Sequence, residues 1–166
     1  MKLKNFLISS MLILSLVLFI GCTSDGSSKV SNVPDATKGE PQWWLNMKGP
    51  AYQVLVYSFA DSDGDGFGDF QGLISKLDYL NDGNPETTTD LGVELLWLSP
   101  IHPAASYHGY DVKDYMAINP QYGTMADFEQ LILECANRNI KVILDLVFNH
   151  SSTSHPWFEA MLADPA

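Results

Sequence analysis

Residues 142–150 read VILDLVFNH, and this stretch decides how the rest of the chain is interpreted. Its first part, residues 142–148, is an apolar run with a single aspartate, which is typical of a parallel strand buried on both faces. Asp145, Asn149 and His150 then place polar groups at the end of that run. Enzymes built on parallel sheets assemble their sites where such strands end. The stretch therefore predicts a buried parallel strand that ends in a functional edge.

Two further strand–helix units precede this strand. Residues 52–59 and 93–98 are rich in β-branched, aromatic and leucine side chains and predict strands. Residues 70–80 carry apolar side chains at helical spacing, and a second helix is expected after Thr124, with Asp127 as its capping-box partner. This alternation predicts an α/β fold with a parallel sheet, either a (β/α)8 TIM barrel or a doubly wound sheet. No G-x-G-x-x-G fingerprint follows the first strand, which favours the barrel.

The charge balance excludes some classes of partner. The chain of 166 residues has a formal net charge of −11 and only nine Lys and Arg side chains. Such a surface repels phosphate backbones and anionic lipid headgroups. We therefore expect no nucleic-acid partner and no electrostatic docking to a membrane, and the sequence implies no protein partner.

The first 22 residues have the layout of an export signal. Lys2 and Lys4 precede an apolar run over residues 6–20, and Gly21-Cys22 follows at once. Phe19-Ile20-Gly21-Cys22 resembles a bacterial lipobox, which implies that Cys22 becomes lipidated and anchors the protein to a membrane. The alternative is an uncleaved N-terminal anchor. Both interpretations place the remaining chain outside the cytoplasmic membrane, as a cell-surface or periplasmic lipoprotein.

The chain after Cys22 divides into a tether and a folded part. Residues 23–41 are rich in Ser, Gly, Thr and Pro and predict a flexible tether, and residues 42–166 hold all the predicted strands and helices. Cys135 lies on the apolar stripe of the second helix, so we expect it to be buried as a small apolar residue. We therefore expect no disulfide between Cys135 and Cys22.

An aspartate-rich loop follows the first strand. Residues 61–69 read DSDGDGFGD, with carboxylates at alternate positions and glycines that allow tight turns. Oxygen ligands spaced in this way bind hard cations such as Ca²⁺, and a backbone carbonyl can complete the set. An EF-hand would need Glu at the twelfth position, where Gly72 stands, so a calcium loop of another kind is expected. A solvated acidic turn is the alternative; the candidate ligands are Asp61, Asp63, Asp65, the carbonyl of Phe67, and Asp69.

The long segment before the second helix has the composition of a sugar site. It contains YHGYDVKDY over residues 107–115. Sugar rings stack their C–H faces on aromatic rings, and their hydroxyl groups bond to His, Asp and Asn side chains. Each such residue alone has a plain structural explanation, and the combination is what indicates a sugar site.

Together these motifs resemble glycoside hydrolase family 13, the α-amylase family. Asp145 to His150 is similar to the family's conserved region at the end of barrel strand three, and Gly109-Tyr110-Asp111 looks like the loop after strand two. The resemblance implies that Tyr110 stacks on the sugar at subsite −1, with His150 and His108 also in contact with substrate. It implies structural roles for Asp111, Asp145 and Asn149, although Asn149 is a calcium ligand in many amylases. The Asp61–Asp69 loop is similar to the calcium loop of the oligo-1,6-glucosidase branch.

The resemblance also implies an activity, and it implies that the catalytic residues for this activity are not among residues 1–166. Family members hydrolyse α-glucans such as starch with retention, by a nucleophile and an acid that follow strands four and five. Residues 1–166 reach only strand three, so a truncated barrel without catalytic residues and inactive by itself is expected. Tyr107 favours an α-amylase over an α-glucosidase, oligo-1,6-glucosidase or cyclodextrinase. Two alternatives are not enzymes: a non-catalytic glycan-binding lipoprotein and a dockerin-like calcium-binding module.

Overall fold

The computed structural model of the protein describes residues 43–164. The predicted signal segment 1–22, with Cys22, and the predicted tether 23–41 lie outside the described residues. Within the described part no helix is long and apolar enough to cross a membrane. In chain order the elements are η1 (Trp43–Leu45), β1 (Ala51–Val54), η2 (Val56–Ser58), α2 (Phe70–Ser75), α3 (Leu77–Leu80), β2 (Leu95–Leu98), α4 (Met125–Asn137), β3 (Lys141–Leu144) and α5 (Pro156–Ala163).

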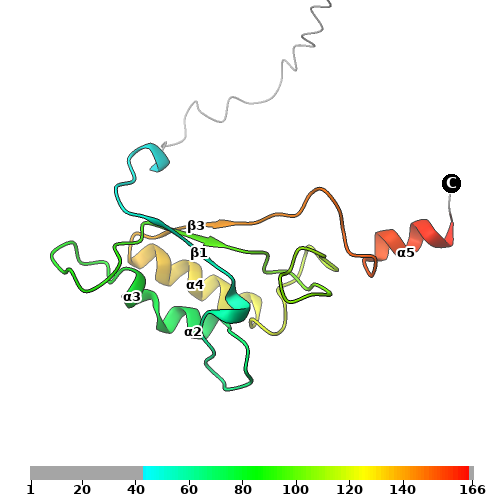
Figure 1. The fold of residues 1–166 in the computed structure, drawn as a ribbon, viewed down its shortest axis with the longest axis horizontal. Coiled ribbons are helices and arrows are strands. Elements are labelled where there is room, and N and C mark those ends of the chain that lie inside the picture. Colours follow the sequence, from blue (N-terminus) through cyan, green and yellow to red (C-terminus); the bar gives the residue numbers. More distant parts are fainter. Residues whose placement is uncertain (1–42, 165–166) are drawn as a thin grey trace, which may run out of the picture. The chain divides into compact units, whose positions relative to one another are not determined.

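The three strands form one parallel sheet in the order β1-β2-β3. Helices α2, α3 and α4 pack together on one side of this sheet, whereas α5 stands apart beyond the segment that follows β3 (Figure 1). Parallel strands need crossover connections, and the helices provide them. The predicted parallel α/β arrangement is therefore confirmed.

The core lies between the sheet and the three helices. Leu96 and Leu98 of β2 are fully buried, whereas Trp97 between them is 36% exposed on the opposite face. From the helices, Phe70, Leu73 and Leu131 are fully buried. The core also holds Val54, Val56, Leu77, Leu80, Val93, Ile101, Tyr122, Cys135 and Ile140.

The helices follow the predicted signals closely. Thr124 caps α4 through the Asp127 backbone N–H, and the Asp127 side chain accepts in return from the Thr124 backbone, so the predicted capping box is confirmed. The single helix expected over residues 70–80 is instead two short helices that meet at Lys76. Cys135 is buried, as predicted.

The strands are shorter than predicted. The strand expected over residues 52–59 ends at Val54, and Val56–Ser58 forms a 3-10 turn. The N–H of Gly68 donates to the carbonyl of Tyr57 (2.7 Å), and a Cβ on Gly68 would lie 2.0 Å from the Val56 carbonyl oxygen. The chain therefore turns after Val54, where Gly68 of the following loop packs against residues 56 and 57. The alternation of apolar and polar residues does not reveal such a contact.

The third strand is neither as long nor as buried as predicted. The strand expected over residues 142–148 ends at Leu144, although Asp145 N–H still donates to the carbonyl of Leu98 (2.9 Å). Ile143 and Leu144 are 37% and 36% exposed. The prediction of burial on both faces is wrong for residues 43–164, because the described helices α2, α3 and α4 cover only one side of the sheet (Figure 1).

Candidate functional site

Asp145 joins three segments at the carboxyl ends of the strands. Its Oδ1 accepts from Nε1 of Trp97 on β2 (2.8 Å), and its Oδ2 accepts from the hydroxyl of Tyr110 (2.5 Å). The hydrogen bond to Asp145 raises the pKa of the Tyr110 hydroxyl, and burial adds to this. Tyr110 is therefore held as a neutral donor, with its ring 40% exposed beside the carboxylate.

His150 brings the segment after β3 against the same tyrosine. Its Nε2 lies 2.9 Å from the carbonyl oxygen of Tyr110, and its Nδ1 lies 3.3 Å from the amide nitrogen of Asn149. The hydroxyl of Tyr115 lies 2.8 Å from the carbonyl oxygens of both Val147 and His150. These hydrogen bonds connect residues 110–115 with residues 147–150, which are far apart in sequence.

His108 and Asp111 shape the loop on either side of Tyr110. The Tyr110 backbone N–H donates to Nδ1 of His108 (3.1 Å), which leaves Nε2 of that ring free to act as a donor. Asp111 accepts from both the hydroxyl and the backbone N–H of Ser106. Burial opposes ionisation of Asp111, but these bonds outweigh it and hold the pKa of the carboxyl below its usual value. Gly109 has a φ of +81°, and a Cβ there would lie 2.8 Å from the Pro100 carbonyl oxygen.

The Asp61–Asp69 loop gathers three carboxylates. Asp61, Asp63 and Asp65 each place one oxygen so that all three lie within 4.8 Å of one another. The loop is tightly turned, because Asp61 accepts from the N–H groups of Gly64 (2.7 Å) and Gly66 (2.9 Å). These hydrogen bonds lower the pKa of the Asp61 carboxyl. A cluster of ionised oxygens on a tight turn fits the ligand set that a hard cation such as Ca²⁺ prefers.

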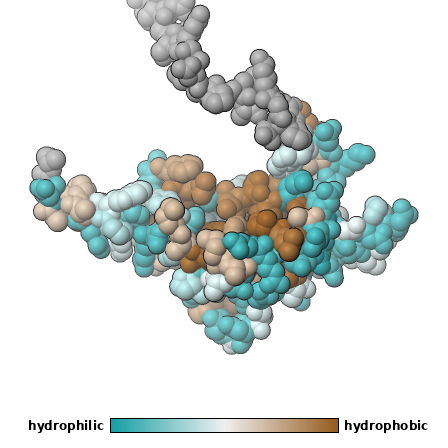
Figure 2. Space-filling model, turned by 180° about the vertical axis from the view of Figure 1, so that it is seen from behind, coloured by the Kyte–Doolittle hydropathy of each residue, from teal (hydrophilic) through white to brown (hydrophobic). Residues whose placement is uncertain are grey.

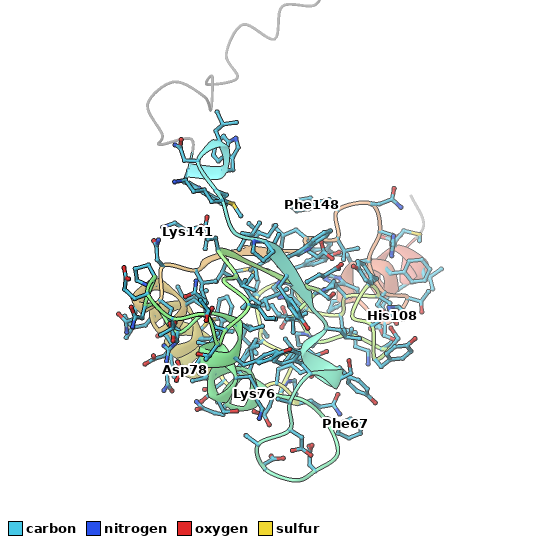
Figure 3. The ribbon with its side chains drawn as sticks, turned by 60° about the vertical axis from the view of Figure 1, so that its left-hand side comes forward. Phe67, Lys76, Asp78, His108, Lys141 and Phe148 are labelled. Atoms are coloured by element: carbon cyan, nitrogen blue, oxygen red, sulfur yellow. The ribbon has the colours of Figure 1, made fainter. Side chains whose placement is uncertain are left out.

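Asp69 and Phe67 lie at the end of this loop, and the role of the Phe67 carbonyl as a cation ligand stays a prediction. Asp69 caps α2 by accepting from the N–H of Gly72 (2.6 Å), and it also accepts from Ser62. It does not belong to the three-carboxylate group, so its role as a cation ligand stays a prediction. The Phe67 ring packs against Tyr57 with centroids 5.0 Å apart; Figure 3 shows Phe67 beside the loop and His108 above it.

The sequence-predicted residues fall into two groups in space. Tyr110, His108, Asp111, Asp145, Asn149 and His150 come together at the strand ends, and Asp61, Asp63 and Asp65 form the carboxylate loop. Their individual roles with sugar or metal stay predictions.

Sequence reasoning missed three residues that hold this site together. These are Trp97, Ser106 and Tyr115, each of which bonds to a predicted residue or to its loop. Trp97 could have been found, because it alternates with Leu96 and Leu98 and must face away from the core. A cleft of about 540 Å³ also lies beside His150; its mostly apolar lining is His102, Tyr115, Leu146, Val147, Phe148, Ser151 and Trp157.

The arrangement combines an exposed aromatic ring with groups that can form hydrogen bonds. An exposed tyrosine ring and two histidines lie beside carboxylates that already accept hydrogen bonds from the protein. A retaining glycosidase needs a carboxylate free to attack carbon and a second one to protonate the leaving oxygen. Both oxygens of Asp145 already accept hydrogen bonds from Trp97 and Tyr110, so this carboxylate is not free for either role.

Comparison with known proteins places the chain in a family. The model of the α-amylase catalytic domain matches residues 53–166. The α-amylase SusG of Bacteroides thetaiotaomicron is 46% identical over 93% of this chain and 23% of its own length. Alpha-amylase 3 of Dictyoglomus thermophilum is 58% identical over 64% of this chain and 20% of its own length, and the oligo-1,6-glucosidase of Bacillus cereus is 44% identical over 72% and 20%.

Solved structures agree with this placement. The crystal structure of the α-amylase from H. orenii superposes with a TM-score of 0.69 and 57% identity, over 70% of this chain and 24% of that chain. The chain spans about a quarter or less of the length of these relatives. With the family match over residues 53–166 and the β1-β2-β3 parallel sheet, the chain belongs to glycoside hydrolase family 13, the α-amylase family, and forms the first part of that family's (β/α)8 barrel.

Proposed function

We propose that the protein of which residues 1–166 form a part hydrolyses α-1,4-glucosidic bonds in starch or maltooligosaccharides with retention. The observation that carries this proposal is the bonding of Tyr110 to both Asp145 and His150 at the strand ends, in a chain of this family. That bonding fixes an exposed aromatic ring where a barrel enzyme binds its substrate.

The residues of this chain have binding and orienting roles in the proposed reaction. The Tyr110 ring stacks on the C–H face of a glucose unit, and His108 and His150 donate to its hydroxyl groups. Asp145 holds Tyr110 through its hydroxyl, and Asp111 holds Ser106, whose hydroxyl lies 3.1 Å from Nδ1 of His108. The nucleophile and the acid follow strands four and five, beyond Ala166.

Two observations favour an α-amylase within the family. The relatives with 58% and 57% identity are named α-amylases, whereas the oligo-1,6-glucosidases and trehalose-6-phosphate hydrolases are 44–47% identical in the matches compared. Tyr107, before His108-Gly109-Tyr110, also favours an enzyme that acts on long glucans. The oligo-1,6-glucosidase and α-glucosidase activities are second candidates, because relatives of this chain carry those names. A cyclodextrinase is a further candidate that rests on the family resemblance alone.

The test is the product spectrum of the complete protein. Incubation with soluble starch, maltoheptaose, isomaltose and cyclodextrin should release maltooligosaccharides from the first two, with the new reducing ends in the α configuration by NMR. Faster cleavage of isomaltose would identify an oligo-1,6-glucosidase instead. Binding of glucan without any cleavage would identify a non-catalytic glycan-binding lipoprotein.

We further propose that the Asp61–Asp69 loop binds Ca²⁺ and braces the turn between β1 and α2. The three carboxylates within 4.8 Å support this, as does the tight turn at Gly64 and Gly66. Titration of the chelator-treated complete protein with CaCl₂ should release or absorb heat and raise the melting temperature. The Asp63→Asn and Asp65→Asn double variant should lose both effects, and their absence in the wild type would contradict the proposal.

We also propose that Cys22 carries a lipid that holds the protein at the outer side of a bacterial membrane. The apolar run before Gly21-Cys22 and the low-complexity residues 23–41 support this. Growth with an alkyne-labelled fatty acid should label the wild-type protein in the membrane fraction. The Cys22→Ala variant should lose the label, and an unlabelled wild-type protein would contradict the proposal.

A further inference from the structure

A continuous line of aromatic rings connects the carboxylate loop to the sugar-binding loop. Phe67 packs on Tyr57 with centroids 5.0 Å apart, and Tyr57 packs on Tyr107 at 5.8 Å. Tyr107 then lies 5.4 Å from His108, and His108 lies 5.9 Å from Tyr110. Each separation is within the range in which aromatic rings interact favourably. Tyr57 is the member of this line that contacts a ring from each loop.

The loop end of this line is tied to the carboxylates. The backbone N–H of Phe67 donates to Oδ1 of Asp65 (2.8 Å). The orientation of this carboxylate and the position of the Phe67 backbone are therefore linked by a hydrogen bond. The next residue, Gly68, donates from its N–H to the Tyr57 carbonyl (2.7 Å). Phe67 and Tyr57 therefore form one packed unit, joined by a ring contact and a backbone hydrogen bond.

The other end of the line is tied to the sugar-binding ring. His108 Nδ1 accepts from the Tyr110 backbone N–H (3.1 Å), and Tyr110 is fixed further by its bond to Asp145. His108 is therefore the residue through which Tyr107 is connected to Tyr110. The rings of Tyr107 and Tyr110 are 62% and 40% exposed, so they have room to adjust.

We propose that Tyr57 is a positioning residue that couples the Asp61–Asp69 loop to the sugar-binding side chains. In this proposal, which rests on the cation and sugar binding proposed above, an ordered carboxylate loop presses Phe67 onto Tyr57. Tyr57 in turn fixes Tyr107 and His108, and through them Tyr110. Coupling of this kind is reciprocal, so the cation tightens sugar binding and the sugar tightens cation binding by the same factor.

The test measures this factor in the complete protein with acarbose, an oligosaccharide analogue that is bound but cleaved slowly at most. Calorimetry gives the Kd of acarbose with CaCl₂ and with a chelator, and the Kd of Ca²⁺ without sugar. The wild type should bind acarbose roughly fivefold or more tightly with calcium. In Tyr57→Leu this ratio should fall to about 1, while the calcium Kd without sugar should stay within roughly twofold, because Asp61, Asp63 and Asp65 are intact.

Two variants serve as controls for the ring itself. Tyr57→Phe keeps the ring contacts and should keep the wild-type ratio. Tyr79→Leu removes a tyrosine on α3 that is 56% exposed and is not a member of the line of rings, and it should also keep the ratio. If Tyr57→Leu does not fold, Tyr107→Ala removes the next ring at an exposed position and should abolish the coupling in the same way.

The outcomes separate this inference from the function on which it rests. A wild type that binds neither calcium nor acarbose would overturn the proposed function. A wild type that binds both with a ratio of 1 would leave that function standing and overturn the coupling. Equal weakening of acarbose binding by Tyr57→Leu with and without calcium would also overturn it, because Tyr57 would then have only a structural role.

Discussion

At the scale of single residues, Asp145 determines the geometry of the site. One carboxylate receives Trp97 from a strand and Tyr110 from a distant loop, one on each oxygen. Hydrogen bonds to an ionised group are stronger than bonds between neutral groups. The position of the exposed Tyr110 ring is therefore set by groups that belong to two different strand–helix units.

A pair of variants at Tyr110 separates its ring from its hydroxyl. Tyr110→Phe keeps the stacking surface and loses the bond to Asp145, so acarbose affinity should fall by only about threefold. Tyr110→Ala loses both and should weaken binding by roughly tenfold or more, which is about 1.4 kcal/mol. Calorimetry on the complete protein measures both values, and equal losses in the two variants would show that the ring does not stack on the sugar.

Cys135 should be chemically inert in the folded protein. Burial raises the pKa of its thiol to about 12, and the thiolate is the reactive form. At pH 8 iodoacetamide should alkylate the native protein very slowly and the urea-unfolded protein quickly, because the unfolded thiol has a pKa of about 8.5. Mass spectrometry of the peptide that contains Cys135, after digestion, follows the labelling of this thiol. Equal labelling rates in the two states would contradict its burial.

At the scale of elements, Asp69 stabilises the start of α2 in a pH-dependent way. Burial of Asp69 opposes ionisation, but the bonds from Gly72 and Ser62 outweigh it and lower the pKa of the carboxyl. A lowered pKa in the folded state stabilises the protein above the unfolded value of about 3.9, and this stability is lost as pH falls through the lower, folded value. Asp69→Ala should cost about 1 kcal/mol at pH 7.

The matched control for this cap is Asp69→Asn. Asparagine also accepts from helix N–H groups, so most of the stability at pH 7 should remain, but the contribution that disappears below about pH 4 should be absent. Urea unfolding in the presence of a chelator, at pH 7 and at several values down to pH 3, measures this difference. The same acid sensitivity in wild type and Asp69→Asn would contradict the role of the carboxylate.

The helices could be predicted from the sequence better than the strands. The capping box of Thr124 and Asp127 and the burial of Cys135 are local properties of one helix, and both are confirmed. The early end of β1 is not local, because it depends on the packing of Gly68 against Val56. The helix α5 was not predicted, although Pro156 at its first turn is a common helix start.

The candidate site could be predicted only in part, because some of its contacts follow from the order of the strands and others depend on the path of a loop. Tyr110, Asp145 and His150 belong to motifs at strand ends, and parallel strands bring such ends to one edge. The structure does bring them together. The partners Ser106 and Tyr115 were missed, because their contacts depend on the path of a long loop that no periodicity describes.

At the scale of the whole molecule, one face of the sheet is not covered by any helix among residues 43–164 (Figure 1). Its two outer strand edges are not paired with any other described strand. Exposed apolar side chains lie on or after β2 and β3, and they include Trp97, Ile143, Leu146 and Phe148, which is 84% exposed. Figure 2 shows apolar side chains gathered in the middle of one face of the molecule. Apolar surface of this kind favours association.

We therefore predict that residues 23–166 produced alone are aggregated or partly molten. An unpaired strand edge and an uncovered apolar face both promote association between copies. Size-exclusion chromatography should show large species, and a dye that binds apolar surface should fluoresce with the protein. A sharp, cooperative melt of a monomer would contradict this prediction.

The order β1-β2-β3 has a consequence for the time course of synthesis. The chain emerges from its N-terminus, and each parallel strand is added beside the one before it, so the growing sheet extends from β3. In a barrel of eight strands the outer edge of β1 has to wait for the last strand to arrive. Throughout that interval the backbone groups at both edges of the sheet are unpaired and can pair with a strand of another chain. The first three strands are therefore the part of the protein whose edges stay unpaired for the longest time during synthesis.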